Sequence, residues 1–184
     1  MISRPRIQLV PPAERWRESF LRGFREFQRE GLPWWTGGNL DTAEQDFAMF
    51  VARTLAESSH DSDILVPKTH LWAITGKEFV GRISIHHELT DALRREGGHI
   101  GYDTVPSFRN RGVATEMLRQ ALPRARALGL TEVLLTCDET NAASIRVIER
   151  NGGVLRATKA LAANRPLKRY YWINLATGPT SSSP

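Results

Sequence analysis

A short basic segment carries the residues best suited to binding a phosphate. Arg109 and Arg111 flank the approach to Gly112 and Ala114, and the apolar spacing predicts a helix over 112–128. A helix N-terminus offers unpaired N–H groups and the positive end of the helix dipole, which suits an anion. Gly112 would let the backbone approach that anion closely, although many such junctions carry a glycine for steric reasons alone. The segment therefore predicts an anion site, with a purely structural turn as the alternative.

The elements before this segment are mainly helical. A short strand is expected over 7–10, and a helix over 12–30, where large apolar side chains recur every three or four residues. A second helix is expected over 41–58, with Asp41 as its N-cap and Glu44 three residues later, as in a capping box. The first third of the chain thus supplies one strand and two helices.

After residue 70 the spacing changes from helical to alternating. Strands are expected over 71–75, 79–85, 99–105, 133–137, 154–162 and 169–175, the last two as a hairpin. A further helix is expected over 141–151, and the polar stretch 90–98 is expected to be a connection. Pro123 should kink or end the helix over 112–128, because it removes a backbone donor. This order predicts a mixed sheet with helices on both faces, of the α/β (α+β) class.

Composition bounds the kind of protein. The 184 residues include 25 Lys+Arg and 20 Asp+Glu, a net charge of +5, and 41% are hydrophobic, as in globular chains. No apolar run is long enough to span a membrane, and the N-terminus lacks an apolar signal segment. A single cysteine, Cys137, excludes an internal disulfide. We expect one cytoplasmic domain over 1–175 and a disordered tail over 176–184.

Two motifs resemble signatures of one superfamily. The segment 109–114, R-N-R-G-V-A, is similar to the pyrophosphate-binding signature R/Q-x-x-G-x-G/A of the GNAT N-acetyltransferases. The segment 141–152, N-A-A-S-I-R-V-I-E-R-N-G, resembles their second signature, N-x-x-S/A-x-x-x-x-E-x-x-G. The resemblance extends from about residue 71 to 175. It implies acetyl-CoA-dependent acetyl transfer to an amine, and a mostly antiparallel sheet with a V-shaped splay between two central strands.

The resemblance also assigns residues to the cosubstrate, acetyl-CoA. Backbone N–H groups at the helix start would hold the pyrophosphate, and the strand over 99–105 would pair with the pantetheine arm. Backbone N–H groups near Val105 would polarise the thioester carbonyl. Asn141 and Ser144 would reach the cofactor, although Asn141 can also be a plain N-cap. The residues expected to contact acetyl-CoA are Tyr102, Asp103, Thr104, Val105, Arg109, Asn110, Arg111, Gly112, Val113, Ala114, Thr115, Asn141 and Ser144.

One position departs from the family pattern. Many members place a tyrosine seven residues after the motif asparagine, where it protonates the leaving thiolate. Ile148 stands there in this chain and cannot donate a proton. Either Tyr170 or Tyr171 of the last strand substitutes, or the thiolate leaves unaided, which a thiol of moderate pKa allows.

The general base is open between His99 and Glu88, and Asp103 is a third candidate catalytic residue in a supporting role. Many related sequences use a glutamate at the position of His99, and a neutral imidazole could take the amine proton instead. Asp103 shares a strand face with His99 and could orient the imidazole or attract a cationic substrate. Glu88, near the end of a neighbouring strand, is the rival base, and His99 could be a solvent-exposed residue at the strand start. His86 and His87 are adjacent and point to opposite faces, so no metal site is expected.

The expected acceptor is a primary amine of a small molecule. Trp34 and Trp35, in a predicted loop, could bind it by stacking or could anchor the core. The alternatives are a protein N-terminal or lysine acetyltransferase, and a non-catalytic CoA-sensing or nucleic-acid-binding module of the same fold. Cations alternate with acids along the chain, so a nucleic-acid partner is not favoured, nor is a membrane. The sequence does not fix the oligomeric state, and a homodimer is one alternative.

Overall fold

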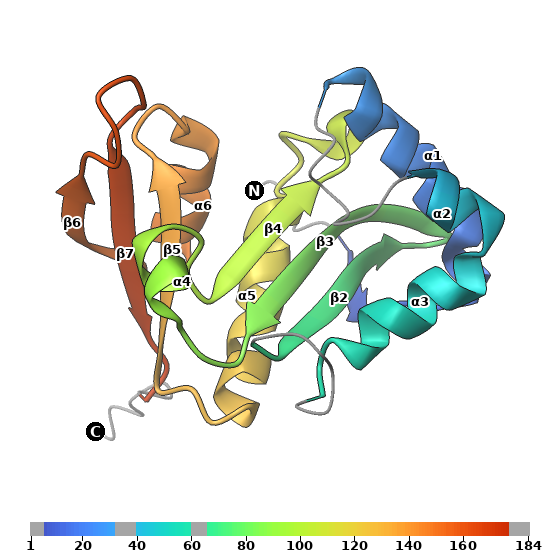
Figure 1. Cartoon of the computed structure of the whole chain (residues 1–184), viewed down its shortest axis with the longest axis horizontal. Helices are drawn as coiled ribbons and strands as arrows, with labels where there is room; N and C mark the ends of the chain where they lie inside the picture. The colour runs from blue at the N-terminus through green and yellow to red at the C-terminus, as the bar shows by residue number, and fades with distance from the viewer. Residues whose placement is uncertain (1–5, 32–39, 60–65, 177–184) are drawn as a thin grey trace, which may run out of the picture.

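The computed structural model describes residues 6–31, 40–59 and 66–176. Its helices are α1 (Arg17–Arg29), α2 (Leu40–Gln45), α3 (Phe47–Ala56), α4 (Asp91–Arg95), α5 (Val113–Ala127) and α6 (Ala142–Arg150). Its strands are β1 (Gln8–Val10), β2 (Lys68–Thr75), β3 (Glu78–His86), β4 (Ile100–Thr104), β5 (Glu132–Asp138), β6 (Val154–Lys159) and β7 (Lys168–Asn174). The predicted α/β class is confirmed (Figure 1).

The strands form two antiparallel sheets, ordered β1-β2-β3-β4 and β5-β7-β6. The sheets meet at one point, where Gly98 bridges to Leu135 and the His99 N–H donates to the Leu134 carbonyl at 2.8 Å. Gly98 has φ +79°, and a Cβ there would collide with the Leu134 carbonyl, so this close approach requires glycine. Beyond this vertex β4 and β5 diverge (Figure 1), which confirms the predicted splay between two central strands.

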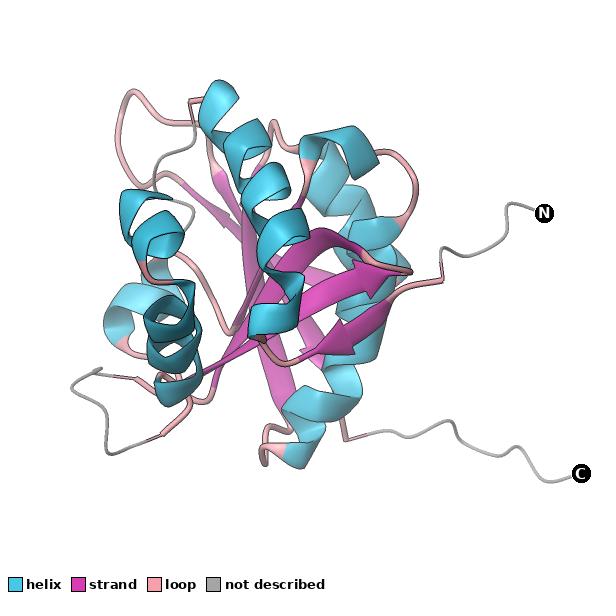
Figure 2. Cartoon of the chain, turned by 90° about the vertical axis from the view of Figure 1, so that its right-hand side faces the viewer, coloured by secondary structure: helices cyan, strands magenta, loops and turns pink. Residues whose placement is uncertain are grey.

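Helices cover both faces of the larger sheet (Figure 2). On one face α1 and α3 bury a cluster of aromatic rings, in which Phe20 stacks on Trp72 of β2 with centroids 4.6 Å apart. On the other face α5 contributes Met117 and Leu118 to a core that includes Ile83 of β3 and Tyr171 of β7. Because that core contains residues of both sheets, α5 holds the two halves together on the side where the strands separate.

The predicted helix over 41–58 is interrupted in the structure. Asp46 lies between α2 and α3, and its carboxylate accepts a hydrogen bond from the Met49 N–H at 2.8 Å. Asp46 therefore caps α3, and Asp41 and Glu44 lie within α2. The predicted capping box is wrong, because a second cap inside the apolar pattern starts a new helix.

Two further expectations need correction. The stretch 90–98 contains α4, whose N-cap Thr90 accepts a hydrogen bond from the Leu93 N–H at 3.2 Å. Pro123 does not end α5, which continues to Ala127, because buried residues on both sides of Pro123 keep this part of the helix packed in the core. No helix within the described ranges is long and apolar enough to cross a membrane.

Candidate active site

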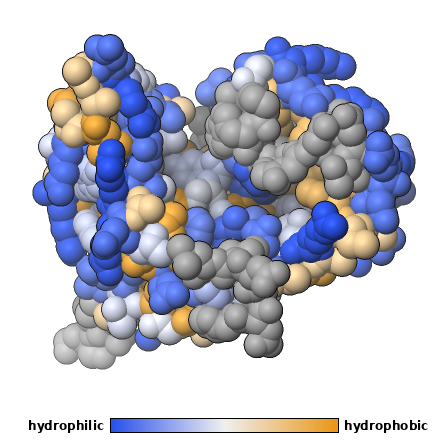
Figure 3. Space-filling view, viewed as in Figure 1, coloured by the Kyte–Doolittle hydropathy of each residue, from blue (hydrophilic) through white to orange (hydrophobic). Residues whose placement is uncertain are grey.

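A cleft of about 580 Å³ lies where β4, the start of α5 and α6 approach one another, and we name it the α5 cleft. It opens in the hollow between the two halves of the molecule (Figure 3). The predicted cofactor residues that line it are Tyr102, Asp103, Thr104, Arg109, Asn110, Gly112, Val113, Ala114, Thr115, Asn141 and Ser144. The structure therefore brings both sequence motifs to one site.

The start of α5 is shaped for an anion. Asn110 and Gly112 both adopt the left-handed conformation, with φ of 60° and 79°. Gly112 is the N-cap of α5 and offers no side-chain hydrogen bond to the first turn. The N–H groups of Val113, Ala114 and Thr115 lie in that first turn, where helical N–H groups have no intrahelical acceptor. This arrangement can hold a phosphate against the positive end of the helix.

Two predicted contacts, Val105 and Arg111, do not line the cleft, and a third, Arg109, is engaged by another residue. Val105 is buried in the aromatic core, and its N–H donates to the Val80 carbonyl at 3.0 Å, so it cannot polarise a thioester. Arg111 lies over the Phe108 ring, 5.3 Å from its centroid, and does not line the cleft. Arg109 does line the cleft, but both of its terminal nitrogens donate to the Glu30 carboxylate, at 2.8 and 2.7 Å.

The edge of β4 that faces β5 pairs with no described strand, although the Thr104 carbonyl accepts a hydrogen bond from Arg109 Nε at 3.3 Å. His99 accepts from the His86 N–H, and Val105 donates to Val80, so alternate residues of this strand direct their backbone groups toward β3. The backbone groups of Tyr102 and Thr104 consequently face the gap toward β5. The Thr104 hydroxyl is buried and has no hydrogen-bond partner among the described residues. An extended ligand chain could pair with this edge as an added strand.

A second cavity of about 800 Å³, the β4–β5 cavity, lies between the diverging strands. Its lining includes Arg82, Ser84, Glu96, Leu135, Asp138, Ile148, Arg165 and Lys168. Three residues line both cavities: Tyr102, Asp103 and Ser144. We name these three residues the junction, since a group bound in one cavity would meet a group bound in the other there.

The junction carries a phenol and a carboxylate on opposite faces of β4. Adjacent residues of a strand point to opposite faces, so Tyr102 is directed toward α6 and Asp103 toward the β4–β5 cavity. The Tyr102 hydroxyl donates to the Ser144 carbonyl at 3.5 Å, and burial raises the pKa of this phenol to about 12. The Asp103 carboxylate accepts from Arg82 Nε at 3.0 Å. Burial lowers the pKa of Arg82, and the charge of Asp103 opposes that effect.

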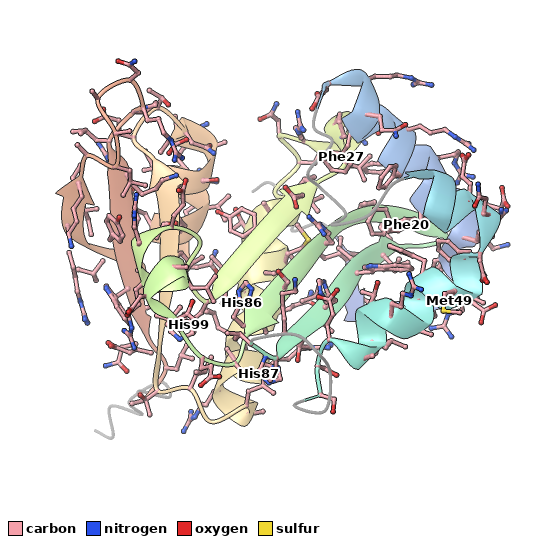
Figure 4. All side chains as sticks on the ribbon, in the orientation of Figure 1. Phe20, Phe27, Met49, His86, His87 and His99 are labelled. Carbon is pink, nitrogen blue, oxygen red and sulfur yellow. The ribbon has the colours of Figure 1, made fainter. Side chains whose placement is uncertain are left out.

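His99 lies at the vertex and not at the junction (Figure 4). Its Nδ1 accepts a hydrogen bond from the Leu134 N–H at 2.9 Å, and the side chain is buried. Nδ1 can accept only if the ring proton is on Nε2, so neither nitrogen has a lone pair available for a substrate proton. Burial also lowers the pKa of His99 to about 4. This geometry opposes the predicted base role and gives His99 a role in joining the two sheets.

The remaining predicted residues lie away from both cavities or outside the described ranges. Glu88 is exposed in the turn after β3 and lines neither cavity. The Tyr170 hydroxyl donates to the Arg95 carbonyl at 2.7 Å, and the Tyr171 hydroxyl to Glu149 at 3.1 Å, so neither phenol is placed at the junction. Trp34 and Trp35 lie outside the described residues. Among the described residues, no group of acids, histidines and cysteine is arranged to hold a metal ion.

The vertex histidine leads to a prediction about acid stability. The folded His99, with a pKa of about 4, binds fewer protons than an unfolded histidine with a pKa near 6.5. Its contribution to the free energy of unfolding is therefore complete above pH 6.5 and is lost as the pH falls toward 4. His99→Asn keeps an acceptor for the Leu134 N–H but does not titrate. Between pH 7 and 4.5 we expect the free energy of unfolding to fall in both proteins, but to fall less in His99→Asn. The difference between the two decreases should be at least about 1 kcal/mol.

The measurement is urea denaturation at each pH, compared between the two proteins. His86 contributes to the same acid loss in both, because burial lowers its pKa to about 4 as well. Parallel pH curves for wild type and His99→Asn would contradict the assignment of a neutral His99 at the vertex.

Two arginines of the α5 cleft were missed by the sequence reasoning. Arg146 and Arg150 lie on the side of α6 that lines the cleft, together with Ala143 and Val147. These positions follow a spacing of three, four and seven residues, which places them on one helix face. The helical period of the second motif indicates them: the residues three, four and seven positions after Ala143 lie on the same face of α6, and Arg146 and Arg150 are two of these.

A comparison with protein families identifies the class. The family model described as "Acetyltransferase (GNAT) domain" matches residues 6–154, which is most of the chain. The protein therefore belongs to the GNAT acetyltransferase family, and the resemblance seen in the two motifs is confirmed. Acetyl-CoA is the cosubstrate of this class of enzyme, and the comparison with curated proteins gives no match.

Solved structures show the same fold at low sequence identity. RimJ from Mycobacterium smegmatis, solved with CoA-disulfide, has a TM-score of 0.68 at 21% identity, over 91% of this chain and 81% of that one. The microcin C7 self-immunity acetyltransferase MccE, solved with acetyl-CoA and AMP, has a TM-score of 0.66 at 16% identity, over 91% and 92%. A spermidine N-acetyltransferase chimera from Vibrio cholerae and hSSAT has a TM-score of 0.61 at 14% identity, over 92% and 96%.

Proposed function

We propose that this protein is an N-acetyltransferase that moves the acetyl group of acetyl-CoA to a primary amine of a small molecule. The observation that carries the proposal is the junction, where the α5 cleft and the β4–β5 cavity share Tyr102, Asp103 and Ser144. A donor held in the first cavity and an amine held in the second would meet between the diverging strands. Holding both reactants in this way supplies much of the rate of a two-substrate reaction.

The α5 cleft fits acetyl-CoA on three grounds. The uncapped start of α5 suits the pyrophosphate, and the backbone edge of β4 at Tyr102 suits the pantetheine arm. The buried Thr104 hydroxyl gains a hydrogen-bond partner if a polar chain lies beside it. Bound there, acetyl-CoA supplies a thioester: the amine nitrogen forms a bond to the acetyl carbon, and the carbon–sulfur bond breaks to release CoA.

Asp103 is the proposed base. Its carboxylate lines the β4–β5 cavity and is oriented by the charge-assisted hydrogen bond from Arg82. A negative charge at this place attracts a protonated amine, and the carboxylate can then take up its proton directly or through a water molecule. Of the three candidate catalytic residues from the sequence, Asp103 alone lines either cavity, so the base role passes to the residue that was expected only to orient His99 or attract the substrate.

Tyr102 is the proposed acid. Ile148 leaves the family's usual tyrosine position without a proton donor, and Tyr102 presents a phenol to the same helix, α6, from the neighbouring strand. A pKa of about 12 keeps this hydroxyl protonated at neutral pH, so it can protonate the leaving sulfur. After turnover, Asp103 returns its proton to solvent and Tyr102 takes one up.

The β4–β5 cavity favours a small acceptor. Its volume of about 800 Å³ lies in the range of small-molecule sites. Ion pairs between Glu96 and Arg165 and between Asp138 and Lys168 occur within its lining, and they connect the end of α4, the end of β5 and the segment that leads into β7. Small-molecule and protein acceptors both occur among the fold's relatives, so the acceptor class needs a direct test.

The test is release of CoA thiol from acetyl-CoA with a panel of acceptors. The panel holds a polyamine, amino-acid amides, a peptide with a free N-terminus and a blocked peptide with one lysine. We expect release with a small primary amine and none with its acetylated form. Release with peptides alone would establish a protein acceptor instead. No release with any acceptor, together with salt-dependent DNA binding, would replace the enzyme by a nucleic-acid-binding module.

Tyr102→Phe tests the acid in the same assay. The variant keeps the ring and its packing but removes the proton donor. We expect turnover to fall by about a hundredfold with acetyl-CoA affinity unchanged. Wild-type turnover in Tyr102→Phe would show that the thiolate leaves without a protein donor.

A further inference from the structure

We propose that Arg146 and Arg150 of α6 bind the 3′-phosphate of coenzyme A and so make the enzyme selective for the 3′-phosphorylated cofactor. The inference rests on the proposed function of the α5 cleft. Both arginines line that cleft, yet neither belongs to the segment 109–114 that resembles the pyrophosphate signature. We name Arg146 and Arg150 the positive wall, since their two positive charges line the α5 cleft beside the start of α5.

The two side chains are placed to act together. Arg146 and Arg150 are four residues apart in α6, a spacing that puts their Cβ atoms about 5–6 Å apart on one helix face. Asn151 fixes this end of α6 to the first turn of α5, since its Nδ2 donates to the Thr115 carbonyl at 3.2 Å. The face of α6 that carries the two arginines is therefore held next to the helix start that suits the pyrophosphate.

The charge of these arginines is available to a ligand. Arg109 is engaged by Glu30 in a two-pronged ion pair, and Arg111 lies over the Phe108 ring. In the part of the chain that the structure describes, neither Arg146 nor Arg150 forms an ion pair with a carboxylate. Two exposed guanidinium groups that form no ion pair among the described residues suit a doubly charged phosphate, which arginine can bind through two parallel hydrogen bonds.

Their position along α6 matches the layout of the cofactor. Ser144 belongs to the junction, where the thioester would react, and Arg150 lies six residues further along the helix, about 9 Å along its axis. The positive wall thus lies away from the reacting end of the cleft. Coenzyme A carries its 3′-phosphate at its nucleotide end, opposite the thioester. That group is a phosphate monoester, which carries close to two negative charges at pH 7.

The test compares acetyl-CoA with 3′-dephospho-acetyl-CoA by titration calorimetry. We expect the wild type to bind acetyl-CoA at least about tenfold more tightly. Arg150→Ala and Arg146→Ala should each weaken acetyl-CoA by about five- to tenfold and change the affinity for the dephospho form by less than about twofold. Arg150→Lys should retain part of the preference. Arg126→Ala, an exposed arginine at the far end of α5, is the matched control and should change neither affinity.

Each outcome decides the inference. Equal losses for both cofactors would overturn it, because the arginines would then serve the pyrophosphate or the adenine. Equal affinity of the wild type for both cofactors would also overturn it, while leaving acetyl transfer intact. Failure of the wild type to bind acetyl-CoA at all would reject the proposed function and this inference together.

Discussion

Asp103→Asn is expected to lower turnover by about 10²–10⁴-fold, the usual contribution of a general base. The amide cannot take up the amine proton and no longer attracts a cationic acceptor. Its oxygen can still accept the hydrogen bond from Arg82 Nε, so the buried guanidinium keeps a partner. Acetyl-CoA affinity should stay within about twofold of wild type, since the proposed phosphate site lies at the start of α5.

The measurements are steady-state turnover with the best acceptor of the panel and calorimetry with acetyl-CoA. Glu88→Gln is the matched control, because it removes an exposed carboxylate that lines neither cavity, and it should leave both quantities unchanged. If Asp103→Asn keeps wild-type turnover, the base is another group of the β4–β5 cavity, with Glu96 and Asp138 as the next carboxylates to test.

Gly112→Asp is expected to weaken acetyl-CoA by at least about tenfold, which corresponds to about 1.4 kcal/mol. The substitution places a carboxylate where the pyrophosphate would approach the start of α5. It also forces a side chain into the left-handed conformation, with φ 79°. Repulsion between the two anions and the shifted loop both oppose binding, and calorimetry with acetyl-CoA measures the sum.

Gly129→Asp separates the two effects. Gly129 follows the other end of α5, has φ +90° and has open space where a Cβ would be placed. This control should lower thermal stability to a similar degree but leave acetyl-CoA affinity unchanged. Equal affinity in Gly112→Asp and Gly129→Asp would contradict the assignment of the phosphate site to the start of α5.

The local parts of the site followed from the sequence. A glycine N-cap, a basic loop and a helix are encoded within a few residues, so the local pattern of 109–115 is enough to predict an anion site there. The contributions that depend on distant pairing could not be predicted in this way. His99 was expected to be available because it stands where many related sequences carry a glutamate, but its ring accepts a hydrogen bond from the Leu134 N–H, which belongs to the other sheet. Nothing in the spacing around His99 indicates that partner.

In the fold, too, some features could be predicted from the sequence and others could not. The splay between two central strands followed from the motifs, because the family resemblance implies it, and the final hairpin followed from the alternating pattern. The break between α2 and α3 was missed because Asp46 lies inside an apolar pattern, where a helix interior and a new N-cap differ only in the backbone around one residue. The prediction for Arg109 was also incomplete. Its partner Glu30 lies at the end of α1, in a distant part of the sequence, so the local pattern does not indicate it.

If acetyl-CoA binds at the start of α5 as proposed, the ion pair between Arg109 and Glu30 would make α1 compete with the cosubstrate for Arg109. Glu30 follows the last residue of α1, and Glu26 of the same helix accepts hydrogen bonds from the Ser107 N–H and hydroxyl at 2.9 and 3.0 Å. If Arg109 turns to the pyrophosphate, α1 loses the ion pair between Glu30 and Arg109 and keeps only the hydrogen bonds of Glu26 to Ser107 among these contacts. Thermodynamic linkage makes this effect reciprocal. If a second molecule binds better when α1 is held on the loop, it lowers the affinity for acetyl-CoA by some factor, and acetyl-CoA lowers the affinity for that molecule by the same factor. Neutralising Glu30 would remove this antagonism.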